Sequence, residues 1–170
     1  MIAIIDYGAG NLRSVQKACE YVGAKTTITS DKSEILSADQ VILPGVGAFG
    51  DCMASLHRAD LVDCIGQAAA SGKPFLGICL GLQLLFEASE ETPGIPGLGI
   101  FLGKNVRIPP KTGMKIPHMG WNSLNYSKDC PLFAGLPEHP FVYFVHSYYM
   151  QPENPDLIAA TTEYCATLPV

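Results

Sequence analysis

Cys79 lies at a point in the sequence where a thiol is able to act as a nucleophile. The apolar run at residues 74–78 predicts a buried strand, and the apolar spacing at 82–87 predicts a helix directly after the cysteine. Gly77 and Gly81 permit a sharp strand-to-helix turn, the arrangement of a nucleophile elbow. The positive end of such a helix favours the thiolate. A buried structural cysteine is the alternative, because free cysteines are among the most buried residues.

Two glycine-rich turns accompany this cysteine. Residues 44–50, PGVGAFG, follow a predicted strand and precede a predicted helix, so their backbone N–H groups are able to face a phosphate or an oxyanion. The missing Walker lysine excludes a P-loop, and GAGN at residues 8–11 lacks the third glycine of a dinucleotide fingerprint. Taken singly, each is an ordinary tight turn. Beside a reactive Cys79, the N–H of Leu80 and one from residues 45–47 would form an oxyanion hole.

Strands and helices alternate through the first half of the chain. Strands are predicted at residues 2–6, 25–29, 40–43 and 74–78, and helices at 12–22, 31–36, 49–56 and 61–70. Asn11 and Asp31 are predicted to cap the first two helices, and Pro44-Gly45 to end the third strand. This order predicts an α/β fold with a doubly wound, mostly parallel sheet and helices on both faces. Ligands of such sheets bind beyond the carboxyl ends of the strands, where both turns and Cys79 fall.

The pattern changes in the second half of the chain. Residues 92–99 are rich in Pro and Gly and predict a loop. Strands are predicted at 100–108, 116–122, 141–146 and 157–162, with a short turn at 130–135 and no long helices. We therefore expect an antiparallel edge in the C-terminal half. No shift in composition marks a domain boundary, so residues 1–170 are predicted to form a single domain.

The composition excludes several functional classes. Of the 170 residues, 48% are hydrophobic and 16% are charged, which is typical of a compact α/β protein. The net charge of −5 and the lack of a Lys/Arg cluster argue against nucleic-acid binding. No stretch approaches the roughly 18 apolar residues of a membrane helix, and no signal peptide is recognisable, so we expect no membrane association. The six cysteines lack CxxC spacing, which argues against a metal site or disulfide framework and favours a reducing cytoplasm.

Several segments in order resemble one enzyme family. GICLGLQLLFEASEE around Cys79 is similar to the nucleophile segment of the class I glutamine amidotransferases, most of which carry a double glycine where this chain has PGVG. Five further segments resemble one branch of that family, the glutaminase subunits of imidazole glycerol phosphate synthases of histidine biosynthesis: DYGAGNLRS, PGVGAFG, PHMGWN, YFVHSYY and ATTEY. The resemblance covers essentially the whole sequence.

The resemblance implies a mechanism and a set of residues. Cys79 attacks the side-chain amide carbon of glutamine, ammonia leaves, and water hydrolyses the glutamyl thioester. The implied oxyanion hole consists of Val46, Gly47 and Leu80. The residues placed beside bound glutamine are Gly45, Gln83, His146, Ser147 and Tyr148. The residues placed at the interface with a (β/α)8-barrel cyclase subunit, which receives the ammonia, are Asn11, His118, Met119, Trp121 and Asn122. No cofactor and no metal are implied.

One part of the family pattern is missing from these residues. The family completes its triad with a His and a Glu from a QFHPEKS-like segment downstream of ATTEY, whereas this sequence stops at Val170. We therefore expect a single class I amidotransferase domain that lacks its C-terminal segment, its general base and its orienting carboxylate, and that is impaired in catalysis. His146 is assigned to the lining of the substrate site rather than to the role of general base.

Two other functions stay open at this point. One is a catalytically inactive, truncated module that still binds the cyclase. The other is a different cysteine-nucleophile hydrolase of the same fold class, such as a peptidase. Normal glutaminase activity of these 170 residues would exclude the first alternative. Alkylation of Cys79 by iodoacetamide without protection by glutamine would favour the second.

Overall fold

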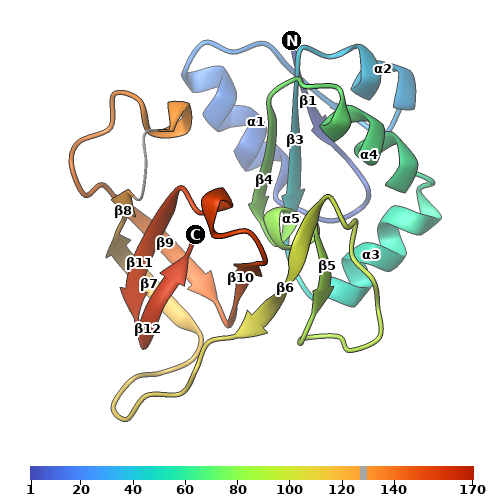
Figure 1. The fold of residues 1–170 in the computed structure, drawn as a ribbon. Coiled ribbons are helices and arrows are strands. Elements are labelled where there is room, and N and C mark those ends of the chain that lie inside the picture. Colours follow the sequence, from blue (N-terminus) through green and yellow to red (C-terminus); the bar gives the residue numbers. More distant parts are fainter. Residues whose placement is uncertain (127–129) are drawn as a thin grey trace. The chain divides into compact units, whose positions relative to one another are not determined.

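The computed structural model describes residues 1–126 and 130–170. They form two compact units, Met1–Phe101 and Leu102–Val170, which differ in architecture. The first unit combines a parallel sheet with helices, and the second consists mainly of antiparallel strands (Figure 1).

The first unit alternates strands and helices in the predicted order. Its strands are β1 (Ile2–Ile5), β2 (Thr26–Thr29), β3 (Gln40–Gly45), β4 (Phe75–Cys79) and β5 (Phe86–Ser89). Its helices are α1 (Leu12–Tyr21), α2 (Lys32–Ser37), α3 (Phe49–Arg58), α4 (Val62–Ala70) and α5 (Leu80–Gln83). Up to Cys79, the predicted alternation is therefore confirmed, with small shifts at the ends of the elements.

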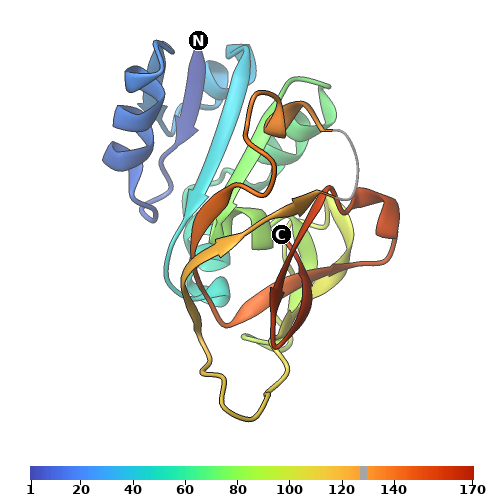
Figure 2. The same ribbon diagram turned by 90° about the vertical axis from the view of Figure 1, so that its left-hand side faces the viewer.

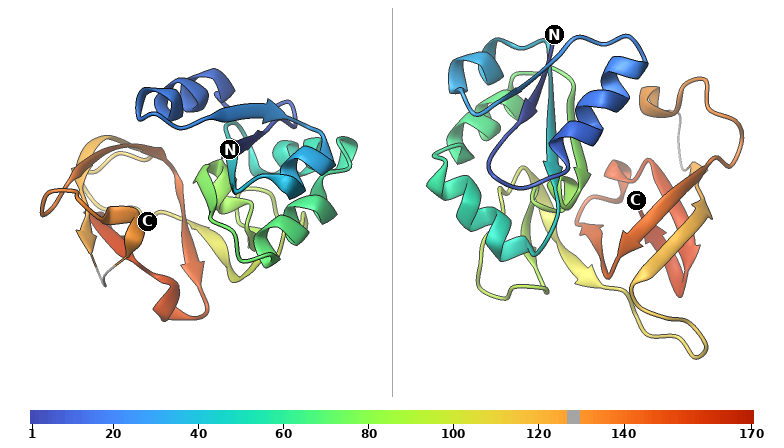
Figure 3. Two further views of the ribbon diagram at one scale, coloured as in Figure 1. Left: turned by 90° about the horizontal axis from the view of Figure 1, so that it is seen from above. Right: turned by 180° about the vertical axis from the view of Figure 1, so that it is seen from behind.

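A parallel four-stranded sheet in the order β2-β1-β3-β4 forms the centre of the first unit. α1 lies on one face of this sheet, and α3 and α4 lie on the other (Figure 2, Figure 3). The doubly wound arrangement predicted from the sequence is therefore confirmed. The chain runs from β1 outward to β2 and then returns to β3 and β4 on the other side. Because the strand order reverses between β1 and β3, this is the point where such folds bind ligands, outside the carboxyl ends of the strands.

The core of the first unit fills the layer between the sheet and α2, α3 and α4. Ile5, Val41 and Leu43 face this layer from the strands. The largest fully buried residues that the helices contribute are Ile35, Phe49, Met53, Leu56 and Ile65. Burial of one such side chain stabilises the fold by about 1.5–3 kcal/mol. The layer therefore holds the carboxyl ends of the strands in fixed positions.

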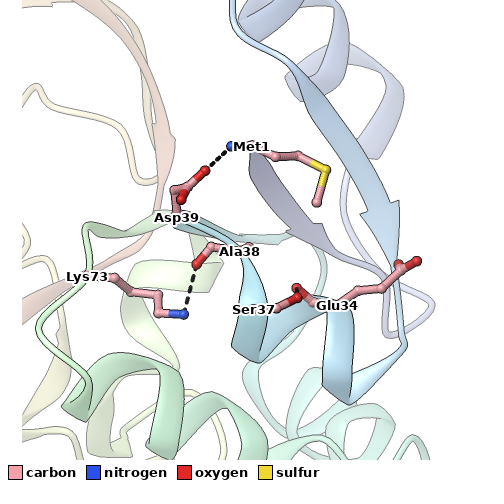
Figure 4. A network of polar contacts seen from close by, with 6 residues as sticks. All are labelled: Met1, Glu34, Ser37, Ala38, Asp39 and Lys73. Carbon is pink, nitrogen blue, oxygen red and sulfur yellow. Dashed lines mark hydrogen bonds and ion pairs between the residues drawn. The ribbon is translucent and has the colours of Figure 1, made fainter.

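Polar contacts tie together the opposite, amino ends of the strands (Figure 4). The N-terminal ammonium of Met1 forms an ion pair with Asp39, and the N–H of Asp39 donates to the carbonyl oxygen of Met1 at 3.1 Å. The hydrogen bond and charge of this ammonium lower the pKa of Asp39. Lys73 donates to the carbonyl oxygens of Leu36 and Ala38, at 2.7 and 2.8 Å. These contacts between segments far apart in the sequence hold the amino ends of the strands together.

Three predicted local signals have different outcomes. Asp31 accepts hydrogen bonds from backbone N–H groups in the first turn of α2, so its predicted capping role is confirmed. Asn11 occupies the N-cap position of α1, but its side chain makes no capping hydrogen bond. The prediction that Pro44-Gly45 ends β3 is wrong, because the pairing of β3 with β4 continues until Gly45 lies opposite Cys79.

The second unit is built from antiparallel pairs. Its strands are β6 (Phe101–Arg107), β7 (His118–Ser123), β8 (Asn125–Tyr126), β9 (Phe141–His146), β10 (Tyr148–Pro152), β11 (Ala160–Tyr164) and β12 (Ala166–Pro169). β6 pairs with β10, β7 pairs with β9, and β11 pairs with β8 and β12. Its two 3-10 turns are η1 (Pro131–Phe133) and η2 (Pro155–Leu157). The predicted antiparallel character is confirmed, whereas β8, β10 and β12 were not predicted.

Candidate active site

Cys79 occupies the bend between β4 and α5 in a backbone conformation that few non-glycine residues adopt. Its φ and ψ angles are 55° and −119°, and the residue is exposed. Such a conformation costs about 1–3 kcal/mol and persists only where the surrounding structure enforces it. The strained, exposed turn has the form of a nucleophile elbow. The alternative of a buried structural cysteine is wrong.

Close backbone packing enforces this turn. A Cβ atom on Gly81 would lie 1.9 Å from the carbonyl oxygen of Leu43, and one on Gly45 would lie 2.5 Å from the nitrogen of Gly81. A Cβ atom on Gly77 would lie 2.6 Å from the Cα atom of Leu82. Only glycine fits at these positions without a backbone shift. The ends of β3 and β4 and the first turn of α5 therefore touch through main-chain atoms.

The helix after Cys79 is shorter than predicted. α5 ends at Gln83, and Phe86–Ser89 forms β5, so the prediction of a helix through residue 87 is wrong. The N–H groups of residues 97–101 donate to the carbonyl oxygens of residues 84–87 at 2.8–3.3 Å. A continuing helix would need those carbonyl oxygens for its own hydrogen bonds. Because a single turn carries little of a helix macrodipole, the expected help to the thiolate is small.

The loop with the predicted oxyanion donors lies next to Cys79. In the parallel register of β3 and β4, Gly45 is the direct neighbour of Cys79. Val46 follows with an exposed side chain, and Gly47 has a φ of 98°. Leu80, the other predicted donor, begins α5 directly after the cysteine. The structure thus brings the candidate nucleophile together with all of the predicted oxyanion residues.

Two further predicted residues lie in the first unit. Gln83 is buried at the end of α5, four positions after Cys79. Residues four apart share one side of a helical turn, so Gln83 is well placed to line a site at the sulfur. Asn11 is exposed at the beginning of α1, in the loop that follows β1.

Two buried side chains that hold this loop were missed by the sequence analysis. The hydroxyl of Tyr7 donates to the carbonyl oxygen of Pro44 at 2.8 Å, and the thiol of Cys52 donates to the carbonyl oxygen of Val46 at 3.3 Å. Burial is the main cause that raises the pKa of each group, so both stay protonated near neutral pH.

The far end of the loop is fixed at the start of α3. Its N-cap residue, Ala48, has no side chain that caps the helix. Instead, the N–H of Phe49 donates to a carboxylate oxygen of Glu91 at 2.8 Å, and the N–H of Gly50 donates to the hydroxyl of Thr92 at 3.2 Å. A carboxylate at the positive end of a helix is stabilising. Glu91 and Thr92, which the sequence analysis did not single out, therefore anchor the loop from a distant segment.

In the second unit, His146 forms a hydrogen-bonded pair with His118. His118 Nδ1 and His146 Nε2 are 2.9 Å apart, and His146 Nδ1 is 2.9 Å from the carbonyl oxygen of Tyr148. A carbonyl oxygen only accepts hydrogen bonds, so the proton in the contact with Tyr148 lies on His146 Nδ1. The other nitrogen of this neutral ring, Nε2, is then an acceptor, and His118 Nδ1 donates to it. Burial lowers the pKa of both rings, which keeps the pair neutral near pH 7. Ser147, which lies between His146 and Tyr148 in the sequence, is half-buried. Its carbonyl oxygen accepts a hydrogen bond from the N–H of Ile108 at 2.9 Å.

His118 and Asn122, both predicted at a partner interface, contact atoms of the second unit itself. His118 is 3% exposed and stacks on the rings of Tyr164 and Phe144, with centroids 3.9 and 4.6 Å away. The side-chain amide of Asn122 donates to the carbonyl oxygen of Glu163 at 3.0 Å. These two residues therefore support β7 from within the unit.

Met119 and Trp121, the other predicted interface residues of β7, belong to an exposed apolar face. They lie opposite Val145 and Tyr143 of β9, and Phe141 continues the same row. All five side chains are exposed, Trp121 by 70%. The rings of Trp121 and Tyr143 meet edge to face at 5.6 Å. Contiguous exposed apolar surfaces are common at interaction sites.

Within 1–126 and 130–170, no group of three His, Cys, Asp or Glu side chains is placed to hold a metal ion. In the same part of the chain, no helix has both the length and the apolar character needed to cross a membrane. The six cysteines are free thiols.

Sequence comparisons connect this geometry to a known family. The family model for glutamine amidotransferase class-I matches residues 3–167. A protein of Thermosynechococcus vestitus named imidazole glycerol phosphate synthase subunit HisH is 56% identical, over 94% of this chain and 77% of its own length. A protein of the same name from Syntrophotalea carbinolica is 51% identical, over 98% of this chain and 84% of its own length.

Solved structures share the fold at lower identity. A glutamine amidotransferase crystal structure has a TM-score of 0.75 at 16% identity and covers 100% of this chain and 83% of its own. PurLQS from Thermotoga maritima has a TM-score of 0.70 at 20% identity, covering 98% of this chain and 76% of its own. At these identities the likeness concerns the fold alone.

Proposed function

The chain belongs to the class I glutamine amidotransferases, and on this premise we propose that it is the glutaminase subunit of an imidazole glycerol phosphate synthase. In this role it hydrolyses glutamine to glutamate and passes the ammonia to a cyclase subunit in histidine biosynthesis. Identities of 56% and 51% to relatives named as that subunit support the substrate and the pathway. The observation that carries the chemistry is the exposed elbow of Cys79 beside the loop at residues 45–47.

We propose that Cys79 is the nucleophile. Its thiolate forms a C–S bond with the side-chain amide carbon of glutamine, and the negative charge moves to the former carbonyl oxygen. The N–H groups of Leu80 and of Val46 or Gly47 donate to this oxygen, and loss of one such donor typically costs about 2.7–4 kcal/mol of transition-state stabilisation. The C–N bond then breaks, and the nitrogen leaves as ammonia with the proton that the thiol released. Water hydrolyses the thioester, which yields glutamate and restores the thiol.

The proton transfers of this reaction need a general acid–base group. In the family pattern that group is a His oriented by a Glu in a QFHPEKS-like segment, which is not part of these 170 residues. His146 is committed to His118 and to the carbonyl oxygen of Tyr148. These contacts of both ring nitrogens argue against a role for His146 as the base. We propose that Gly45 and Gln83 line the glutamine site, and the family resemblance assigns the segment at 146–148 to glutamine as well.

We propose that the cyclase docks on the exposed apolar face of β7 and β9, with Met119 and Trp121 at its centre. Exposed aromatic side chains of this kind are typical anchors of protein interfaces. His118 and Asn122 hold β7 in place. Asn11, in the first unit, is a separate proposed contact of the cyclase. The two compact units together are proposed to form one amidotransferase domain, which the family match over residues 3–167 supports. The assembly is a heterodimer of the cytoplasm, a compartment in which free thiols persist.

The test measures the release of glutamate by the complete protein assembled with its cyclase. Cys79→Ala should lower turnover by at least about 10³-fold, because nucleophile and base act as a unit. Cys19→Ala, which removes a half-buried thiol of α1, is the matched control and should keep the wild-type rate. Unchanged turnover in Cys79→Ala would rule out the mechanism. Binding of the cyclase without any glutaminase activity in the wild-type complex would instead identify an inactive binding module.

A further inference from the structure

A network of hydrogen bonds connects β7, β9 and β10 of the second unit. It begins at Asn122 of β7, passes through His118 of the same strand and His146 of β9, and ends at the carbonyl oxygen of Tyr148, the first residue of β10. The successive distances between polar atoms are 3.4, 2.9 and 2.9 Å. His118, in the middle of the network, is 3% exposed. Because water has little access to a ring this buried, the protein itself must supply its hydrogen-bond partners.

The side-chain amide of Asn122 fixes the direction of this network. Its nitrogen donates to the carbonyl oxygen of Glu163 at 3.0 Å, and its oxygen accepts from the N–H of Ser123 at 2.9 Å. The second N–H of the amide nitrogen therefore donates to His118 Nε2, and the proton of this neutral ring lies on Nδ1. His118 Nδ1 is then the donor to His146 Nε2. The same assignment follows from the carbonyl oxygen at the other end of the network, so the two ends agree.

The network ends at a corner where the protein passes from one antiparallel pair to another. β9 pairs with β7, whereas β10 pairs with β6, and only Ser147 separates β9 from β10. The ring of His146 contacts both strands that adjoin this corner, since Nε2 accepts from β7 and Nδ1 donates to the first residue of β10. The carbonyl oxygen of Ser147 itself accepts from the N–H of Ile108. The path of the backbone at 146–148 therefore depends on both contacts of the His146 ring.

His118 determines which nitrogen of His146 carries the proton. A neutral His146 ring is able to donate to Tyr148 only when its proton lies on Nδ1. The donor of His118 stabilises this tautomer, because it needs an unprotonated Nε2 as its acceptor. Without that donor, the proton is free to move to Nε2, and the hydrogen bond to Tyr148 is then lost. Burial lowers the pKa of both rings, so near pH 7 each ring carries a single proton.

We propose that His118 is a positioning residue for the glutamine site. Through its hydrogen bond to His146 it holds the corner at Ser147, and with it the segment at 146–148 that the family resemblance assigns to glutamine. This inference rests on the proposed function, since that assignment is part of it. Groups that hold a substrate act only in the correct position, and a small displacement of them has a large effect. His118 itself does not touch glutamine in this proposal.

The first test compares variants of the complete protein assembled with its cyclase. His118→Phe keeps a ring against Tyr164 and Phe144 but removes the donor to His146. We expect KM for glutamine to rise about 5- to 20-fold with kcat changed less than about twofold, because substrate binding rather than a transition-state interaction is weakened. His118→Asn removes the stacked ring but keeps a nitrogen donor at the position of Nδ1. It should therefore restore KM to within about twofold of the wild-type value.

Tyr164→Phe is the matched control for this comparison. It keeps the ring that stacks on His118 and removes a hydroxyl that donates to the carbonyl oxygen of Lys115 at 2.6 Å, outside the network. Its KM should equal that of the wild type. A wild-type KM in His118→Phe would overturn the proposal. Equal increases of KM in His118→Phe and Tyr164→Phe, or in His118→Phe and His118→Asn, would also overturn it, because they would trace the effect to packing rather than to the donor.

The tautomers of the two rings provide a measurement that needs no variant. Nitrogen NMR spectra of the wild-type complex with isotope-labelled histidine should show the proton on Nδ1 in both His118 and His146. A proton on Nε2 of either ring would overturn the proposed network. Release of glutamate by the wild-type complex tests the proposed function separately. An inactive wild-type complex would therefore contradict the function, whereas an active one with an unchanged KM in His118→Phe would contradict only the positioning role.

Discussion

The two units of this chain differ in where their large apolar side chains lie. In Met1–Phe101, the large aliphatic residues of the strands and of α2, α3 and α4 are enclosed between the sheet and the helices. In Leu102–Val170, Ile108 and Leu168 are buried, but a row of large apolar side chains on β7 and β9 is exposed, and buried His118 pairs with half-buried His146. The difference indicates that the first unit is a scaffold complete in its own packing. The exposed row of the second unit is the surface at which we propose that the partner docks.

The two units also use different means to define their functional segments. Around Cys79, main-chain atoms touch across Gly45, Gly77 and Gly81. Around His146, side-chain hydrogen bonds and ring stacking set the geometry. A substitution should therefore act through steric overlap in the first unit and through unpaired polar groups in the second. The following predictions test this contrast, from the largest expected effect to the smallest.

Gly81→Ala should be the most damaging single-methyl substitution. The new Cβ atom would overlap the carbonyl oxygen of Leu43, which is main chain and cannot rotate away. We expect the free energy of unfolding to fall by about 3 kcal/mol or more. Gly66→Ala in α4 is the control, because its new methyl group meets nothing within 4 Å and should stabilise the helix by about 0.5–1 kcal/mol. Similar thermal midpoints for the two variants would contradict the packing of the elbow.

Ile65→Ala and Trp121→Ala should separate folding from partner binding. Ile65 is 0% exposed, so its truncation should cost about 2–5 kcal/mol in chemical denaturation, whereas truncation of exposed Trp121 should change stability by less than about 0.5 kcal/mol.

The same Trp121→Ala variant should weaken binding of the cyclase by about 2 kcal/mol, roughly 30-fold in Kd, if the face on β7 and β9 is the docking surface. Calorimetric titration measures this change, with Tyr21→Ala as control, since Tyr21 is an exposed aromatic of α1 outside that face. Equal losses of affinity in the two variants would place the docking surface elsewhere.

The histidine pair should make the second unit sensitive to mild acid. Both rings have lowered pKa values in the folded state, so the unfolded chain binds more protons once the pH falls below the ordinary histidine value of about 6.5. Stability contributed by the pair is complete above that pH and is lost as the pH falls toward the folded pKa values. His146→Leu leaves a buried donor of His118 unpaired and should cost about 1–3 kcal/mol at pH 7.5.

In the His146→Leu variant, the free energy of unfolding should also change less between pH 7.5 and 5.5 than it does in the wild type. His57→Gln, on α3 and outside the pair, is the control. A wild-type protein with constant stability across that interval would contradict the assignment of two neutral rings.

Lys73→Ala should have the smallest effect and lower the free energy of unfolding by about 1 kcal/mol. It removes two hydrogen bonds to carbonyl oxygens at the end of α2, but water partly replaces these hydrogen bonds. Lys25→Ala, which removes an exposed lysine before β2, is the matched control and should change stability by less than about 0.5 kcal/mol. A denaturation midpoint equal to that of the control would show that the amino edge does not depend on Lys73.

The local sequence pattern was sufficient to predict most of the strands and helices of the first unit. The runs that form β1, β3 and β4 are short, apolar and bounded by turn residues, so their identity as buried strands follows from composition. The carboxylate of Asp31 and the glycine at position 77 act within a few residues of their own position, whereas Gly81 packs against the carbonyl oxygen of Leu43 in a distant strand. The position of the elbow was therefore predictable from its neighbours in sequence, whereas the contact with β3 that enforces the turn was not.

Contacts between distant segments account for what was missed. Residues 84–87 have a helical spacing, but the backbone of residues 97–101 takes their carbonyl oxygens and forces a strand. β8, β10 and β12 are two to five residues long, and their pairing partners rather than their composition make them strands. Tyr7 and Cys52 serve the loop through main-chain carbonyls, which no pattern of residue types records.

The contact between Gly45 and Gly81 also has a mechanical consequence. Because the backbone of β3 bears directly on the peptide after Cys79, no compliant side chain separates the oxyanion loop from the sulfur. A displacement of the loop at residues 45–47 would therefore also displace the turn at Cys79. A shift of the end of β3 would move the turn at Cys79 and the loop at residues 45–47 together.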